Sequence, residues 1–221
     1  MRIFRKSLKK ATEEEKLLQK VHKGDKAAQE LLYRQHVRYL AALSSRYVAN
    51  DDDAKDVLQE SFIKIFSSIN NFEYRGEGSL RAWMARITLN EALAFIRKNC
   101  NAALVDIADY DDKLADDEIE TEGIPTDVIY RFIRELPDGY RAVFNLYVIE
   151  DKSHKEIAEL LGIKVNTSAS QLHKAKAILA KKINQYKTSI FSFAYSLNSN
   201  VITAICHACS ASFSFCTPSE R

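Results

Sequence analysis

Apolar residues recur every three or four positions along most of the first hundred residues, which is the period of helices that bury one face. Thr12 followed by Glu15 is a capping-box pattern for a short helix that runs through Val21. Asp25 can cap a second helix that ends near Val48. Third and fourth helices are predicted over about 51–69 and about 79–98, with two glycines marking the loop between them.

The same period returns over residues 124–187, which predicts a second helical block. Pro137 is tolerated in the first turn of a helix, so a helix is expected to begin there. Ser153 with Glu156 repeats the capping-box pattern, and Gly162 is expected to end that helix. A longer helix is predicted from near Asn166 to near Tyr186.

Two stretches depart from this pattern. Residues 106–122 hold nine Asp and Glu against one Lys, which favours an extended, self-repelling linker over a charged loop within one domain. The tail, 188–221, has no charged residue before Glu220 and is expected to be an irregular, poorly ordered appendage or a read-through end. The predicted domains are therefore 1–105 and 124–187, with a linker at 106–123 and a tail at 188–221.

Composition narrows the fold class. Of 221 residues, only six are Gly and three are Pro, too few for the many turns of a β-sandwich. We therefore predict an all-α protein. The net charge of +2 says little about partners. No secretory signal is expected, because the first residues do not show a charged segment followed by a long apolar run. A reducing, cytoplasmic location is expected, without structural disulfides.

Charge is distributed unevenly in the second block. From Gly162 to Lys187 there are six lysines and no acidic residue, as an attraction to phosphates requires. A short helix, a Gly and a second helix form the helix-turn-helix layout. The amino-terminal end of the second helix would then present Thr167, Ser170, Gln171 and Lys174 to a DNA groove. The alternative is an ordinary helical hairpin with a solvated lysine face.

The predicted fourth helix and the loop before it interleave aromatic and basic residues. Trp83 lies among arginines, beside Tyr74 and Arg75. Aromatic rings and guanidinium groups suit unstacked bases and a single-strand backbone. The alternative is that Trp83 is mainly a core residue.

Together these motifs resemble the extracytoplasmic-function (ECF) group of the sigma-70 family of RNA polymerase sigma factors. Residues 21–48 resemble region 2.1, 53–66 region 2.2, 70–98 regions 2.3 and 2.4, and 136–179 region 4. The resemblance implies two small helical domains, of which the first binds core RNA polymerase and melts the promoter −10 element. The second would read the −35 element, and the acidic linker would follow a basic channel toward the RNA exit.

The resemblance also assigns residues, position by position. Asp56, Gln59 and Glu60 would face the clamp of the largest polymerase subunit. The residues that would meet the −10 element are Tyr74, Arg75, Arg81, Arg86, Asn90 and Arg97. The loop 73–79 would capture an extruded base, which needs hydrogen-bond donors and a stacking wall. Thr167, Ser170, Gln171 and Lys174 would meet the −35 element.

The recognition helix departs from the family pattern. Ala169 and Gln171 stand at usually basic positions, and Lys174 and Lys176 replace arginines. Because Gln favours adenine edges where Arg favours guanine, the sequence predicts weaker phosphate contact and no central guanine preference. Asn166 replaces a Gly and is expected to serve as an N-cap.

The sequence does not favour catalytic or metal chemistry. The His and Asp residues show no nucleophilic-triad or metal-ligand pattern, so we predict no enzyme activity, cofactor, metal or small-molecule substrate. The tail holds an incomplete metal-site pattern, formed by Cys206, His207, Cys209 and Cys216. A membrane span in the tail is not favoured, because polar residues interrupt its apolar stretch. The expected partners are core RNA polymerase, promoter DNA and an anti-sigma factor, and the free chain is expected to be a monomer.

Two alternatives from other classes remain at this level. One is a stand-alone helix-turn-helix regulator, which would have no need for the Asp56 face or the Arg86 and Asn90 helix. The other is an interaction protein that has kept the fold, has lost DNA binding and titrates an anti-sigma factor.

Overall fold

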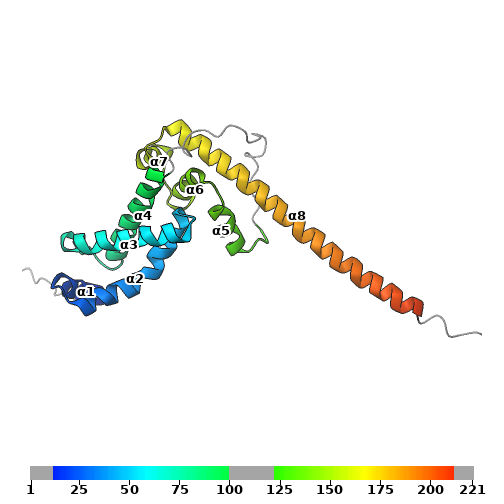
Figure 1. Cartoon of the computed structure of the whole chain (residues 1–221), viewed down its shortest axis with the longest axis horizontal. Helices are drawn as coiled ribbons and strands as arrows, with labels where there is room; N and C mark the ends of the chain where they lie inside the picture. Colours follow the sequence, from blue (N-terminus) through cyan, green and yellow to red (C-terminus); the bar gives the residue numbers. More distant parts are fainter. Residues whose placement is uncertain (1–11, 100–121, 212–221) are drawn as a thin grey trace, which may run out of the picture.

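The computed structural model describes residues 12–99 and 122–211, and over 191–211 only the course of the helix. The first block is built of α1 (Glu13–His22), α2 (Lys26–Tyr47), α3 (Asp51–Ser68) and α4 (Ser79–Asn99), with a short 3-10 turn, η1 (Ile69–Asn71), after α3. Within these residues no strand is present, as the all-α prediction requires. Figure 1 shows α3 and α4 side by side, with α1 against α2.

The second block begins with α5 (Thr126–Arg134) and α6 (Asp138–Phe144). A five-residue π-helix, η3 (Asn145–Ile149), follows, and then α7 (His154–Leu161) and α8 (Val165–Ala211). α6 and α7 both pack on the first half of α8, and the second half of α8 runs away from the other helices (Figure 1).

The predicted helix ends are mostly confirmed by their caps. Thr12 accepts a hydrogen bond from the Glu15 amide, and Asp25 accepts from the amides of Ala27 and Ala28. Ser153 and Glu156 form both bonds of a capping box. Gly162 ends α7 in the left-handed conformation, with φ of 70°, which glycine adopts without steric cost.

Two boundaries in α8 differ from the prediction. α8 begins at Val165, so Asn166 lies inside its first turn and is not the N-cap that we expected. α8 also continues to Ala211 instead of ending near Tyr186, so 188–211 is not irregular. The physical reason is that no Gly or Pro interrupts the chain between Gly162 and Pro218. The acidic linker prediction falls almost wholly on 100–121, outside the described residues.

Three apolar clusters hold the helices together. One lies within the first block, where α1 to α4 bury Leu32, Leu40, Ile65, Leu80 and Met84. Another lies within the second block, between α5, α6 and α8. The third joins the blocks, because Tyr47, Leu93 and Ile96 of the first pack with Leu146 and Ile157 of the second. All five of these side chains are at most 1% exposed, so the two blocks share a buried interface.

Candidate nucleic-acid interface

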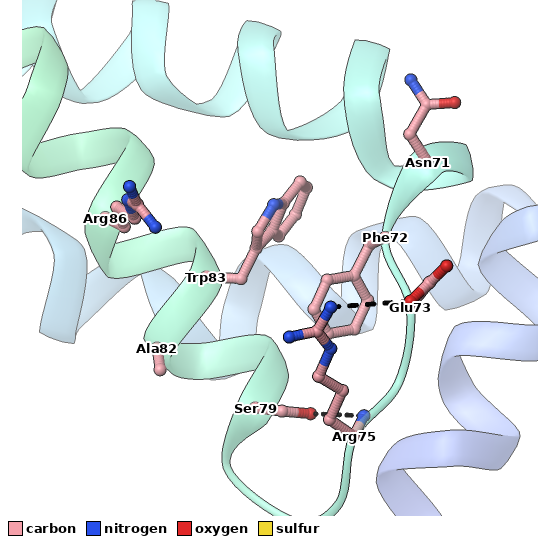
Figure 2. Close-up of a pocket in the computed structure, with 8 residues that line it drawn as sticks. All are labelled: Asn71, Phe72, Glu73, Arg75, Ser79, Ala82, Trp83 and Arg86. Carbon is pink, nitrogen blue, oxygen red and sulfur yellow. Dashed lines mark hydrogen bonds and ion pairs between the residues drawn. The ribbon is translucent and has the colours of Figure 1, made fainter.

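A cavity of about 530 Å³ lies between the loop that follows α3 and the first turns of α4. Its size falls within the usual range for small-molecule pockets, ~300–1,000 Å³. Figure 2 shows Phe72, Glu73 and Arg75 on the loop side and Ser79, Trp83 and Arg86 on the helix side. The family resemblance implied that the loop 73–79, beside the helix with Arg86, captures an extruded base, and this remains a prediction.

The helix and the loop are fixed to each other at Ser79. Its hydroxyl donates to the carbonyl of Gly76 at 2.6 Å and accepts from the amide of Arg75 at 3.3 Å. Gly76 and Gly78 have φ of 121° and 81°, which side chains with a Cβ rarely adopt. These glycines let the chain turn sharply into α4, so that Trp83 and Arg86, one and two turns on, reach the loop.

Two aromatic rings form the apolar wall of the pocket. The rings of Phe72 and Trp83 lie with their centroids 5.0 Å apart at an interplanar angle of 40°. Both side chains are partly buried against the core cluster of the first block. Trp83 is therefore both a core residue, as expected, and a wall of the cavity. Phe72 was not among the predicted site residues, although its position directly before the loop 73–79 was a usable signal.

The polar side of the pocket carries two cations. Arg75 pairs with Glu73 at 3.6 Å, a contact drawn in Figure 2, and both side chains are more than 80% exposed. No ion pair engages Arg86 within the part of the chain that the structure describes. An arginine that forms no ion pair among the described residues, beside two aromatic rings, can bind a phosphate or the edge of a stacked base.

Four other residues that were expected at the −10 element lie outside this pocket. Tyr74 is half-buried and its hydroxyl bonds to Thr12 at 2.7 Å. The Arg81 guanidinium lies 3.8 Å from the ring centroid of Tyr39 on α2. Arg97 donates to the carbonyl oxygen of Leu160 at 3.1 Å, so it contacts the second block. Asn90 is exposed, one turn beyond Arg86.

Asn90 and Arg86 line a second, larger cavity of about 780 Å³ between the two blocks. Its opposite wall comes from the second block and carries Glu150, Glu156 and Glu159, together with Lys152, which pairs with Glu156 at 3.6 Å. Arg46 of α2 reaches across the cavity to Glu150 at 3.4 Å. The acidic wall therefore lies opposite the residues expected to bind a DNA strand, a relationship that the sequence did not reveal.

The α3 face expected to bind polymerase is accessible. Asp56, Gln59 and Glu60 are all exposed and lie within about one turn of the helix. Ile63, 61% exposed, continues this face at the next turn. Ile63 was not among the residues predicted to bind polymerase, although it follows Gln59 and Glu60 at helical spacing. Phe62, on the adjacent side, is buried beneath the ring of Tyr33, with centroids 4.6 Å apart.

The residues expected at the −35 element lie on the first turns of α8, but not all face outward. Thr167, Ser170 and Lys174 are partly exposed, and the Ser170 hydroxyl donates to the carbonyl of Thr167 at 3.1 Å. Gln171 is only 3% exposed, so in this conformation it does not present its amide to a base edge as we expected. The cause is helical register, because Ala175 and Ile178 follow it at four and seven residues and pack in the core.

In residues 12–99 and 122–190, no cluster of His, Cys, Asp and Glu is arranged to hold a metal ion. Among the residues that the structure describes, no helix has the length and apolar character of a membrane span. The tail cysteines lie outside the residues whose side chains are described.

Comparisons with known proteins agree with this geometry. Residues 32–100 match the family model "Sigma-70 region 2", and residues 126–179 match "Sigma-70, region 4". The chain is 32% identical over 179 residues to an ECF RNA polymerase sigma-E factor of Haemophilus influenzae, covering 76% of this chain and 93% of the relative. It is 27% identical over 185 residues to an ECF RNA polymerase sigma-E factor of Salmonella typhi, covering 76% of this chain and 92% of the relative.

A solved structure, "Structure of CnrH in complex with the cytosolic domain of CnrY", is also similar. Its sequence identity is 24% and its TM-score 0.40, over 76% of this chain and 96% of that chain.

Proposed function

The chain belongs to the sigma-70 family and to its ECF group, and from this membership we propose which residues bind the polymerase and the promoter. As an ECF sigma factor it binds core RNA polymerase and directs promoter recognition and transcription initiation. Sigma factors of this family are non-enzymatic initiation factors. We extend this to the chain itself, which acts by binding while core polymerase carries out RNA synthesis.

The cavity between the loop 73–79 and α4 captures one unstacked base of the −10 element. The observation that carries this assignment is the aromatic wall of Phe72 and Trp83, with Arg86 beside it. A base stacked on an aromatic side chain gains about 1–3 kcal/mol, and Arg86 supplies charge to the adjoining phosphate. Asn90, one turn further along α4, can both donate to and accept from the next base.

Trp83 allows a direct test, because it is the only tryptophan of the chain. Its fluorescence is expected to change when a single-stranded −10 oligonucleotide binds. Arg86→Ala should weaken binding by about tenfold, and Arg34→Ala should not. Arg34 is a matched control, since it is an exposed arginine of the same block that pairs with Glu30 at 2.6 Å. Equal effects of the two variants would contradict the assignment.

The exposed α3 face binds the polymerase through charge and one apolar contact. Asp56 and Glu60 supply the charge, Gln59 a polar contact, and Ile63 an apolar side chain available for burial by a partner. Asp56→Ala, Glu60→Ala and Ile63→Ser should each weaken equilibrium binding of the labelled protein to core polymerase. Glu13→Ala, an exposed carboxylate on α1, is the control. Unchanged affinity in all three variants would exclude this face.

The second block binds the −35 element through the partly exposed face of α8. Thr167, Ser170 and Lys174 remain candidate contacts, with exposed Lys164 and Lys181 as phosphate contacts. Gln171 joins them only if α8 repacks when the promoter binds. Promoter scanning with Gln171→Ala and Lys174→Ala distinguishes a buried Gln171 from one that repacking exposes. If Gln171 stays buried, only Lys174→Ala is expected to change the base preference.

The arrangement of the two blocks supports a closed state of the protein, from which the blocks separate when the promoter binds. Glu156 and Glu159 wall the cavity that Arg86 and Asn90 also line. This wall is net acidic even with Lys152 on it, so its carboxylates would repel the phosphates of a DNA strand bound at Asn90. We assign the described conformation to the sigma factor before promoter binding. Family membership also supports an anti-sigma factor as a partner, which co-purification of the full chain from its host would identify.

A further inference from the structure

The amino-terminal helix α1 contacts the base-capture loop at two points. The hydroxyl of Thr12, the N-cap of α1, lies 2.7 Å from the phenol oxygen of Tyr74. The carboxylate of Glu14, in the first turn of α1, accepts a hydrogen bond from the Gly78 amide at 3.0 Å. These contacts join residues 62 and 64 positions apart in the chain. They reach the two ends of the loop, at its second residue and just before α4.

α1 is itself firmly attached to the rest of the first block. Leu18 and Val21 are each 3% exposed and pack in the same apolar cluster as Leu80 and Met84 of α4. At its other end, the His22 ring nitrogen Nε2 lies 3.0 Å from the carbonyl oxygen of Ile69. α1 therefore offers a rigid support on which a loop can be held.

The loop has few other means of holding its shape. Its own polar contacts are the hydrogen bonds between Ser79, Gly76 and Arg75 and the exposed ion pair of Arg75 with Glu73, and its apolar contact with the core cluster comes from Tyr74. Gly76 and Gly78 are free of the steric limits of a Cβ, and fixing one residue costs about 1–2 kcal/mol of conformational entropy. The Gly78 amide has no acceptor within α4, because it precedes the helix. Glu14 supplies that acceptor, and a negative charge there is also favoured by the helix dipole.

We propose that Thr12 and Glu14 are positioning residues that hold the loop 73–79 in its base-capturing shape and thereby set its base selectivity. This inference rests on the proposed capture function of the same pocket. Neither residue touches the pocket, whose lining comes from residues 71–86. They act through Tyr74, which directly precedes the pocket residue Arg75, and through Gly78, which directly precedes the pocket residue Ser79. Loss of either contact lets the loop adopt other shapes, and discrimination between bases falls before overall affinity does.

The test uses the full chain assembled with core polymerase. Short labelled single-stranded DNAs carry each of the four bases in turn at the captured position, and fluorescence anisotropy gives the ratio of highest to lowest affinity. Glu14→Ala and Thr12→Val should each reduce this ratio by about threefold to tenfold. Glu14→Gln keeps an oxygen acceptor and Thr12→Ser keeps the hydroxyl, so both should retain most of the selectivity. Glu13→Ala removes a neighbouring carboxylate that pairs only with Lys16 among the described contacts, and should change nothing.

The outcomes separate this inference from the function on which it rests. Trp83→Ala is measured in parallel, because Trp83 lines the pocket directly. Lost selectivity in Trp83→Ala together with unchanged ratios in Glu14→Ala and Thr12→Val would overturn the inference and leave the capture site standing. Unchanged ratios in all three variants would overturn both. Equal losses in Glu14→Ala and Glu14→Gln would also count against a hydrogen-bonded support, since only one of them removes the acceptor.

Discussion

The guanidinium of Arg141 donates two hydrogen bonds to the carbonyl oxygen of Tyr47, at 3.1 Å from Nε and 3.0 Å from Nη2, across 94 residues of sequence. Tyr47 is the last residue of α2, where helix carbonyls lack partners within the helix. Asn145 donates to the carbonyl of Arg46 at 2.9 Å, and Arg134 to that of Ala49 at 2.8 Å. Side chains of the second block thus cap the carboxyl end of α2, where positive charge is favoured.

Replacing Arg141 should destabilise the protein far more than replacing Arg134. Arg141 is 1% exposed and also donates to the carbonyls of Arg134 and Leu136. Arg141→Met leaves these buried acceptors without donors, and we expect a loss of at least about 2 kcal/mol in the free energy of unfolding. The Arg134 side chain is 43% exposed, so Arg134→Ala should cost less than about 1 kcal/mol. Urea denaturation of both variants measures the difference, and similar losses would contradict the capping role.

Weakening the interface without unfolding it should help DNA enter. Arg134 forms an ion pair with Asp51 and donates a hydrogen bond to the carbonyl of Ala49, both in the first block. Arg134→Ala therefore removes side-chain contacts between the blocks only. We expect this variant of the free protein to bind a −10 single strand about twofold to fivefold more tightly, since less closed state competes. Arg131→Ala removes the same charge from α5, with its contact to Phe132 inside the second block, and should not gain affinity. A gain in both variants, or in neither, would argue against a closed state.

The turn between η3 and α7 carries local strain at Asp151, whose φ is 51°. A left-handed conformation costs a branched side chain about 1–2 kcal/mol, so Asp151→Val should lower the free energy of unfolding by that amount. Asp151→Gly should leave stability within about 0.5 kcal/mol, because relief of strain offsets the greater freedom of the unfolded chain. Thermal unfolding of the two variants provides the comparison, and a neutral Asp151→Val would show that the turn relaxes.

The capping box of α7 should make stability depend on pH in the acid range. Hydrogen bonds from the backbone and side chain of Ser153 hold the pKa of Glu156 below its usual 4.5. Because the folded-state pKa is depressed, the stabilisation is present above pH 4.5 and is lost as the pH falls through the folded value. Urea midpoints measured between neutral and acid pH should therefore fall less in Glu156→Gln than in the native chain.

The matched control for this prediction is Glu159→Gln, which removes a carboxylate from the same helix outside the cap. It should leave the acid-range fall of the urea midpoint as in the native chain. If the urea midpoint of Glu156→Gln falls as much in the acid range as that of the native chain, the pH dependence belongs to other carboxylates.

Helix caps could be predicted from the sequence, because residues close together in the chain determine them. Thr12, Asp25 and Ser153 are caps because their side chains reach amides two or three residues on. The burial of Gln171 was missed because the family resemblance assigned it a role, whereas its position four residues before Ala175 assigns it to the packed face. The length of α8 differs from the prediction because an uncharged, Ser-rich composition favours an irregular tail, whereas the chain has no Gly or Pro between Gly162 and Pro218 to end the helix.

The sequence by itself determined most of the helices, the caps at Thr12, Asp25 and Ser153, and the family, since each depends on short-range periodicity or on motifs read in order. Only the tertiary structure decided that Arg141 and Asn145 cap α2, that Glu159 lines the same cavity as Arg86, and that Glu14 supports the loop at Gly78. These contacts join residues far apart in the chain, and a hydrogen bond to a backbone carbonyl or amide requires no particular residue at the acceptor or donor position. Such contacts leave no pattern in the sequence, so they are fixed by how the packed helices align in space.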